Sequence, residues 1–351
     1  MKTDPILEED ILQAAKTIYR PELNGTCFFI TGATGLIGSQ LCKTLVKCNQ
    51  LYDANITVAA YLRNPAKADK VFEGYRDGLT YVVGNLDADV SYDGPVDYLV
   101  HGASVTSSKD FVNKPVETIL TAIDGTDRVL RFAAEKQVKK MVYLSSLEVY
   151  GTPDGSKETI SEDDYGYINP LSVRSSYSEG KRMVENLCVA YASQFNVPAC
   201  IARLSQTFGA GVEYHDGRVF AEFSRCAIEG KDIVLHTDGS TIRTYCYTAD
   251  AVTALLKLLQ DGASGEAYNV TNPDTACSIR EMAELVAGLN PEKPISVRIE
   301  IPEDLASFGY NPQMVIRLNA DKLISLGWAP ATDLSTMFRR TIESMKKEQT
   351  V

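Results

Sequence analysis

Histidine is scarce in this sequence, and cysteine never occurs in closely spaced pairs. The 351 residues contain three histidines, His101, His215 and His236, which are far apart along the chain. None of the eight cysteines belongs to a C-x-x-C motif, and several stand within apolar stretches. Protein sites for zinc and similar ions usually combine closely spaced histidine and cysteine ligands. We therefore expect no metal site, and we expect the cysteines to be reduced core residues.

Long apolar runs and an excess of positive charge are also missing. No stretch of about 18 consecutive apolar residues, the length that spans a bilayer, is present. The acidic N-terminus has no apolar core of the signal-peptide kind. There are 35 Lys and Arg against 46 Asp and Glu, a net charge of −11, which disfavours nucleic acid and anionic membranes as main partners. The sequence thus predicts a soluble, cytoplasmic protein that binds neither nucleic acid nor membrane.

Three regularly spaced glycines follow a short apolar segment near the start of the chain. Residues 27–31 predict a buried strand, and apolar residues between 36 and 46 recur at helical spacing. Between them, Gly32 allows a tight turn, Gly35 lets the backbone approach a pyrophosphate, and Gly38 lets the helix pack on the strand. The helix N-terminus then offers free N–H groups to the phosphates. This arrangement predicts a dinucleotide site formed by Gly32, Thr34, Gly35, Leu36, Ile37 and Gly38. The alternative is a glycine-rich turn that binds nothing.

Strand and helix patterns alternate after this segment. Further strand candidates are residues 56–62, 79–83, 97–101, 141–145 and 199–204, and helical patterns lie around 65–73, 113–135 and 175–195. Such alternation predicts an α/β fold, a Rossmann-type doubly wound parallel sheet.

A change of pattern divides the chain. Residues 1–24 predict an N-terminal helical extension, because apolar residues between 5 and 20 recur at helical spacing. Residues 25–208 form the predicted dinucleotide-binding domain. Residues 209–340 are rich in loops and short elements. We expect them to form mainly a smaller C-terminal substrate-binding lobe, with some segments returning to the first domain.

Tyr177 and Lys181 stand four residues apart in a predicted helix, so their side chains share one face. A neighbouring ammonium favours the phenolate, and together with the positive nicotinamide ring of a cofactor it could lower the pKa of a tyrosine from its usual value of about 10. Tyr177 can then accept a proton from an alcohol or sugar hydroxyl. Ser146 follows the strand candidate 141–145. It therefore lies at the end of a strand, where ligands bind in such sheets, and could hydrogen-bond the same hydroxyl. Glu148 is either a capping or solvated residue, or a second acid/base group directed at the neighbouring carbon.

Several longer motifs accompany these residues. They are Thr31–Gly38 (TGATGLIG), His101–Ser104 (HGAS), Val142–Gly151 (VYLSSLEVYG), Arg203–Gly209 (RLSQTFG) and Leu326–Trp328 (LGW). Together with the Tyr177/Lys181 pair, they resemble the extended short-chain dehydrogenase/reductase family, the NAD-dependent nucleotide-sugar epimerases and dehydratases. The resemblance covers about residues 25–340.

The resemblance implies a reaction. Within the family, Tyr177–Arg182 (YSEGKR), Asp216–Val219 (DGRV) and Gly239–Thr244 (GSTIRT) are most similar to UDP-glucuronate decarboxylases. Those enzymes use a bound NAD to oxidise C4 of the sugar, lose CO2 from the β-keto acid and reduce C4 again. By this resemblance Glu148 assists at C5, and Arg243 lies near the nucleotide phosphates or the sugar carboxylate. The resemblance also implies a homodimer through the helices around 113–135 and 175–195.

The same resemblance extends the predicted sites. Its implied cofactor contacts include Leu86, Ala103 and Lys181, and its implied substrate contacts are Gln206, Arg218 and Arg243.

Cofactor and outcome each have alternatives. NAD sites of this kind commonly carry an acid at the end of the second strand, but here Arg63 stands there. Arg63 could bind the 2′-phosphate of NADP, or it is a solvated arginine. A tightly bound and recycled NAD is the expected cofactor, and NADP is the alternative that Arg63 allows. Leu147 lacks the hydroxyl that the decarboxylases usually carry before the glutamate, so C4 epimerisation and dehydration at C5 and C6 stay open. A non-catalytic NAD(P) sensor is the alternative from another class.

Overall fold

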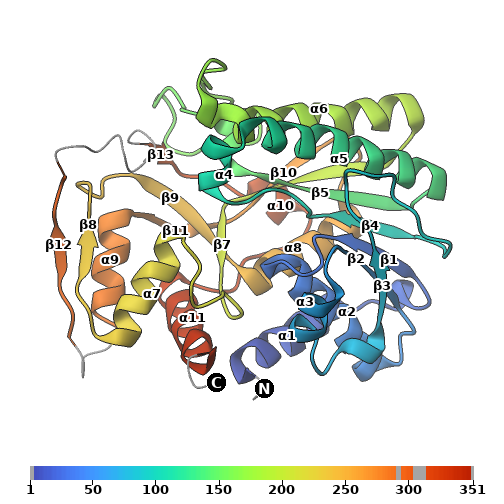
Figure 1. Ribbon diagram of the computed structural model, residues 1–351, viewed down its shortest axis with the longest axis horizontal. Helices are drawn as coiled ribbons and strands as arrows, with labels where there is room; N and C mark the ends of the chain where they lie inside the picture. The colour runs from blue at the N-terminus through green and yellow to red at the C-terminus, as the bar shows by residue number, and fades with distance from the viewer. Residues whose placement is uncertain (1–3, 290–293, 303–313, 349–351) are drawn as a thin grey trace.

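A sheet of seven parallel strands forms the centre of the molecule (Figure 1), in the order β3-β2-β1-β4-β5-β6-β10. The computed structural model describes residues 4–289, 294–302 and 314–348, and its two internal gaps fall within the lobe predicted over 209–340. The strands are β1 (Cys27–Thr31), β2 (Thr57–Leu62), β3 (Leu79–Val83), β4 (Tyr98–His101), β5 (Lys140–Ser146), β6 (Ala199–Leu204) and β10 (Ala267–Val270). All six predicted strands are present, and the doubly wound α/β fold is confirmed.

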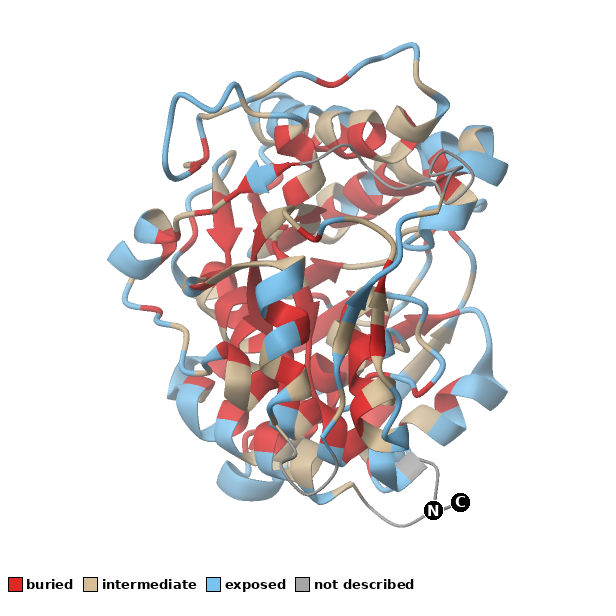
Figure 2. Cartoon of the chain, turned by 90° about the vertical axis from the view of Figure 1, so that its left-hand side faces the viewer, coloured by how far each residue is buried: buried red, intermediate tan, exposed pale blue. Residues whose placement is uncertain are grey.

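Helices cover both faces of this sheet, and alternate residues of each strand point to opposite faces. Phe28 and Ile30 of β1 pack into a core with α1 (Pro5–Ile18), α2 (Leu36–Tyr52), α3 (Pro65–Val71) and α8 (Thr248–Asp261). Phe29 packs on the other side, with α5 (Pro115–Lys136) and α6 (Ser176–Phe195). Figure 2 shows buried residues along the strands and on the helix faces turned towards them. Burial on both faces explains why these strands are apolar throughout.

A smaller unit stands beside the main sheet. Its larger sheet contains β7 (Gln206–Phe208), β9 (Ile242–Tyr247), β11 (Asn272–Ser278) and β13 (Val315–Ile316), and a second sheet pairs β8 (Ile233–Leu235) with β12 (Val297–Ile299). Helices α7 (Val219–Glu229), α9 (Ile279–Ala287) and α11 (Leu334–Glu348) accompany these strands in Figure 1. Phe208, Phe220 and Phe338 lie in their shared core. Helix α8 and strand β10 also come from this part of the sequence, but they complete the main sheet and its covering layer.

The N-terminal helix α1 links the two units. Asp4 caps it by accepting hydrogen bonds from the backbone N–H groups of Ile6 and Leu7 at 3.0 and 3.3 Å. Its apolar face packs against the main core, while its buried Asp10 accepts hydrogen bonds from Tyr247 and from Arg340 of α11, both at 2.6 Å. The extension is thus a structural part of the fold.

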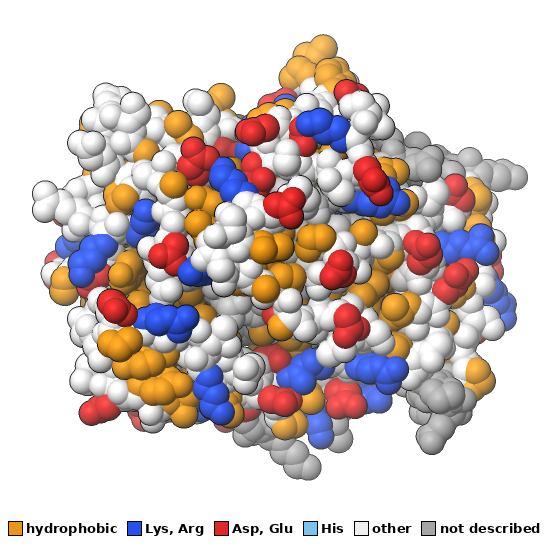
Figure 3. Space-filling view, turned by 180° about the vertical axis from the view of Figure 1, so that it is seen from behind, with side chains coloured by type: hydrophobic (Ala, Val, Ile, Leu, Met, Phe, Trp, Pro, Cys, Tyr) orange, Lys and Arg blue, Asp and Glu red, His pale blue; other side chains and the backbone are white. Residues whose placement is uncertain are grey.

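The surface carries charges of both signs. On the face drawn in Figure 3, Lys and Arg side chains stand among Asp and Glu side chains, without a continuous basic area on its described part. Among the described helices, none is both long and apolar enough to cross a membrane. All eight cysteines are free, and six of them are buried. In the described ranges, no cluster of His, Cys, Asp or Glu side chains could hold a metal ion.

Candidate active site

The three glycines of the turn between β1 and α2 have different roles. Gly32 has a φ of +70°, in the left-handed region that favours glycine. A Cβ added at Gly38 would lie 2.3 Å from the Gly32 carbonyl oxygen, so helix and strand could not pack as they do. A Cβ at Gly35 would meet only that oxygen, at 3.3 Å, and Gly35 lines an open cavity. Gly32 and Gly38 therefore serve the turn and its packing, and Gly35 keeps the approach to the backbone clear for a ligand.

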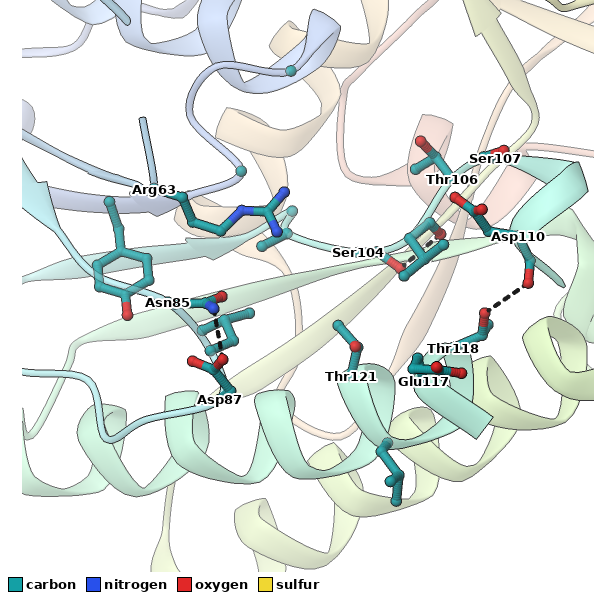
Figure 4. A pocket seen from close by; sticks show the side chains of 18 of the residues that line it. Arg63, Asn85, Asp87, Ser104, Thr106, Ser107, Asp110, Glu117, Thr118 and Thr121 are labelled. Carbon is teal, nitrogen blue, oxygen red and sulfur yellow. Dashed lines mark hydrogen bonds between the residues drawn. The ribbon is translucent and has the colours of Figure 1, made fainter. Parts of the chain in front are cut away.

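A cavity of about 860 Å3 opens beside this turn (Figure 4). Its walls are the turn itself, the segments after β2, β3 and β4, and one side of α5. Carboxyl ends of parallel strands at a reversal of strand order are the usual ligand site of such sheets. The predicted cofactor residues that line the cavity are Gly32, Thr34, Gly35, Arg63, Leu86 and Ala103. The other predicted cofactor residues lie outside the lining of this cavity: Leu36, Ile37 and Gly38, at the start of α2, and Lys181.

Other cavity residues were missed by sequence reasoning. Asn85 and Asp87 follow β3 as Arg63 follows β2, and the Asn85 side chain donates to the Asp87 carboxylate at 2.7 Å (Figure 4). Arg128 of α5 donates to the Leu86 carbonyl oxygen at 2.9 Å and so fixes this segment. The rule that ligands meet strand ends could have identified Asn85 and Asp87.

Three predicted catalytic side chains gather at the carboxyl end of β5. Ser146 ends that strand, and Tyr177 and Lys181 face it from the first turns of α6. The Tyr177 ring stacks on Phe111, with centroids 4.2 Å apart and an angle of 12° between the planes. Lys181 Nζ lies 5.6 Å from the centroid of the Tyr177 ring and donates to the Leu144 carbonyl oxygen at 2.7 Å. The spacing read from the sequence therefore does bring Tyr177 and Lys181 together beside Ser146.

The pKa of Tyr177 in the chain alone is set mainly by burial. Burial raises it to about 12, although the neighbouring Ser146 side chain and the Arg174 charge lower it; the Glu148 charge raises it further. The lowering expected from Lys181 together with a positive nicotinamide ring concerns the cofactor-bound enzyme, so it stays a prediction. Spacing shows that Lys181 is near, but not that the phenol is buried or that the ammonium is bound to a backbone carbonyl.

Burial also shifts the pKa values of Lys181 and His101. It lowers the pKa of Lys181 to about 8, against the opposing effect of the Glu185 carboxylate. It lowers the pKa of His101 to about 3, and the Lys181 charge acts in the same direction. His101 is hydrogen-bonded through one ring nitrogen to Thr31 at 2.7 Å and through the other to Thr126 at 3.0 Å. It therefore stays neutral and acts as a packing residue.

Glu148 lies beside this group and is partly exposed. Its carboxylate accepts a hydrogen bond from Ser178 at 3.2 Å and lies 3.6 Å from an Arg174 guanidinium nitrogen. The preceding Leu147 is 3% exposed and packs in a small core with Val149. The Leu147 side chain thus belongs to this core, whereas the Glu148 side chain is partly exposed.

The predicted substrate residues lie in different settings. Arg243 of β9 is 8% exposed, and its Nε is buried without a hydrogen-bond partner among the described residues; the hydroxyl of Tyr245, on the same strand face, is in the same condition. Gln206 of β7 pairs in register with Tyr245. Buried polar atoms are usually hydrogen-bonded, so each of these two atoms lacks a partner that water or a bound ligand could supply. Arg218, by contrast, is bound to Asp216 at 2.6 Å on an exposed surface.

Comparison with known proteins identifies the family. Residues 28–271 match the model of the NAD dependent epimerase/dehydratase family. UDP-glucuronic acid decarboxylase 6 of Arabidopsis thaliana is 32% identical over 78% of this chain and 78% of its own length. UDP-glucuronic acid decarboxylase 1 of Danio rerio is 28% identical over 91% of this chain and 72% of its own.

Solved structures share the fold. An epimerase from Methanothermobacter thermautotrophicus superposes with a TM-score of 0.76 at 21% identity, covering 97% of this chain and 96% of the other. UDP-glucuronic acid 4-epimerase from Bacillus cereus, in complex with NAD, gives 0.73 at 20% identity, covering 92% and 99%. Together with its glycine turn, its cavity and its Ser146, Tyr177 and Lys181 group, the family match shows that this chain is an enzyme of the NAD-dependent epimerase/dehydratase family.

Proposed function

We propose that this enzyme modifies a nucleotide-activated sugar by transient oxidation at C4, and that its reaction is decarboxylation of UDP-glucuronate. The observation that carries the proposal is the gathering of Ser146, Tyr177 and Lys181 with Glu148 at the end of β5. The UDP-glucuronic acid decarboxylases among its relatives support the choice of outcome. The unpartnered Nε of Arg243 supports an anionic group, such as a nucleotide diphosphate, at β9.

The residues present fit a dinucleotide, because Gly35 leaves its side of the cavity free. Gly32, Thr34, Gly35 and Ala103 would help to hold NAD(P), which would supply a reversible hydride acceptor for C4 of the sugar and a positive nicotinamide ring that would lower the pKa of a nearby phenol. Tyr177 takes the proton of the C4 hydroxyl, which Ser146 holds by a hydrogen bond. Loss of CO2 from the β-keto acid breaks the bond between C5 and the carboxyl carbon and moves its electron pair towards the C4 oxygen. Tyr177, now protonated, donates to that oxygen, and Glu148 lies beside C5, where a proton must be added.

The mass of the product tests this outcome. After incubation of the purified protein with UDP-glucuronate, mass spectrometry should show a product lighter by one CO2. An unchanged mass with altered chromatographic mobility would indicate C4 epimerisation, and loss of one water would indicate dehydration. Either result would retain C4 oxidation and refute decarboxylation. Binding of NAD(P) without turnover of any nucleotide sugar would favour the sensor.

We propose that NAD is the resident cofactor and that Arg63 also lets NADP bind. Arg63 points into the cavity in Figure 4, and it has no hydrogen bond or ion pair among the residues the structure describes. A charge-reversing Arg63→Asp variant is expected to bind NADP about 10- to 100-fold more weakly, the equivalent of ~1.5–3 kcal/mol for charged hydrogen bonds. Its affinity for NAD should stay the same or rise, because a carboxylate at this position suits the ribose 2′-hydroxyl.

Calorimetric titration of both cofactors into the cofactor-free protein measures this difference. Lys70→Asp is the matched control, since Lys70 is exposed on α3 but lies outside the cavity lining. If Arg63→Asp lowers the affinity for NAD and for NADP equally, Arg63 does not distinguish the 2′-hydroxyl from the 2′-phosphate.

We also propose a homodimer across α5 and α6, which lie side by side at the edge of the molecule in Figure 1. Exposed apolar side chains on the two helices are Val116, Ile119, Leu120, Met183, Val189 and Phe195. Pairing of these helices with those of a second copy would remove this apolar surface from water.

A further inference from the structure

Arg174 stands next to both the acid and the tyrosine of the proposed site, although sequence reasoning did not select it. It belongs to the short 3-10 helix Val173–Ser175 directly before α6. One guanidinium nitrogen lies 3.6 Å from a Glu148 carboxylate oxygen, and the guanidinium carbon lies 5.0 Å from the centroid of Phe111. Phe111 in turn stacks on Tyr177. A positive charge therefore stands next to Glu148 and next to the ring that stacks on Tyr177.

The hydrogen-bond donors of Arg174 are largely unused. Within the described ranges it makes no hydrogen bond, and its contact with Glu148 is one long ion pair between side chains that are 24% and 19% exposed. Arg203 and Arg218 differ, because each binds its carboxylate through several hydrogen bonds, the shortest at 2.7 and 2.6 Å. A guanidinium carries five N–H donors in a planar fork that matches a carboxylate. Arg174 thus has the capacity to bind a second anion.

Charge balance at the site calls for such a cation. The proposed function assigns the C4 hydroxyl of the sugar to Tyr177 and C5 to the side of Glu148, so the substituent on C5 is assigned to the neighbourhood of Glu148. A carboxylate there would place two negative charges close together in a partly buried site, which is unfavourable unless a cation lies between them. Two other cations of this part of the site are engaged, since Lys181 donates to the Leu144 carbonyl and Arg182 donates to the carbonyls of Val149 and Gly166. Arg243, whose Nε has no partner among the described residues, is the cation that the proposed function assigns to the nucleotide diphosphate.

We propose that Arg174 recognises a carboxylate on C5 of the sugar, so that the substrate class is a nucleotide-linked hexuronate. On binding, Arg174 exchanges its long contact with Glu148 for a bidentate pair with the substrate. This inference rests on the proposed function, because it assumes that the C4 hydroxyl meets Tyr177. A neutral nucleotide hexose would leave Arg174 paired with Glu148.

Binding of two nucleotide sugars to the holoenzyme tests the inference. The wild-type protein should bind UDP-glucuronate more tightly than UDP-glucose. Arg174→Gln should weaken UDP-glucuronate binding about 10- to 100-fold, the range for charge-assisted bidentate pairs, and change UDP-glucose binding by less than about threefold. Arg174→Lys should restore only part of the loss, because an ammonium cannot form the bidentate fork. Arg280→Gln is the control, since Arg280 pairs with Glu284 on the exposed surface of α9 at 2.9 Å.

The affinity for UDP-glucose also reports whether Arg174→Gln is folded. The inference is overturned if the wild-type protein shows no preference for UDP-glucuronate, or if Arg174→Gln keeps that preference. If the preference for UDP-glucuronate depends on Arg174 but no CO2 is lost, the inference about Arg174 stands and only the proposed decarboxylation is refuted. Loss of CO2 with an unchanged KM in Arg174→Gln would refute the inference and leave the proposed function intact.

Discussion

Tyr177→Phe is expected to lower kcat by about 10²- to 10⁴-fold, the range for removal of a positioned general acid or base. The substitution removes the hydroxyl that exchanges a proton with the C4 oxygen but keeps the aromatic ring. Stacking on Phe111 and the burial of the ring should persist, so the thermal unfolding temperature should change little. Steady-state kinetics with the true substrate, together with thermal unfolding, measure both quantities.

Tyr191→Phe is the matched control for this variant. Tyr191 lies on the same helix, α6, and its hydroxyl donates to Asp127 at 2.6 Å, away from the site. Its loss should leave kcat within about twofold, since the hydroxyl touches no reacting group. Full turnover by Tyr177→Phe would remove Tyr177 from the mechanism.

Arg203→Ala is expected to lower the free energy of unfolding by about 3–5 kcal/mol, the usual cost of breaking a buried ion pair from one side. Arg203 is 1% exposed and donates to the Glu185 carboxylate at 2.7 Å, to the Tyr150 hydroxyl at 3.0 Å and to the Glu162 carbonyl oxygen at 2.6 Å. Without it, the buried Glu185 would retain Ser145 as its hydrogen-bond donor but lose its ion-pair partner. Urea denaturation followed by circular dichroism measures the change.

A double variant separates the ion pair from its surroundings. Arg203→Met combined with Glu185→Leu removes both charges and should recover much of the lost stability, because no unpaired charge stays buried. A single Arg203→Ala variant that unfolds within about 1 kcal/mol of the wild-type protein would contradict this account.

Local patterns predicted the main sheet well because each strand and helix carries its own period. The N-terminal helix is an example, since its apolar spacing and the capping Asp4 both lie within a few residues. Strand β10 was not predicted, because Ala267–Val270 is short and contains Asn269. That residue is fully buried, yet its side chain is satisfied by Tyr150 and by two carbonyls distant in sequence. Only the fold supplies those partners.

The candidate site also combines residues that local patterns predict with residues that only the fold identifies. Tyr177, Lys181 and Ser146 follow from helix spacing and strand ends, which are local features. Arg174 and Tyr245 can be recognised as candidate site residues only in the folded structure. Arg174 contacts Phe111 and Glu148 there, and Tyr245 has a buried hydroxyl without a partner among the described residues, on the same strand as Arg243. The raised pKa of Tyr177 in the chain alone has the same origin, because burial depends on every element packed around it.

The central claim is that a hydride leaves C4 and returns to it within one turnover. UDP-glucuronate carrying deuterium at C4 tests it directly, with the product analysed by mass spectrometry and NMR and the absorbance of reduced cofactor followed during the reaction. We expect a product that has lost CO2, retains the deuterium at C4 and leaves no reduced cofactor to accumulate with turnover. Loss of the deuterium from C4, or reduced cofactor formed in proportion to product, would contradict the account.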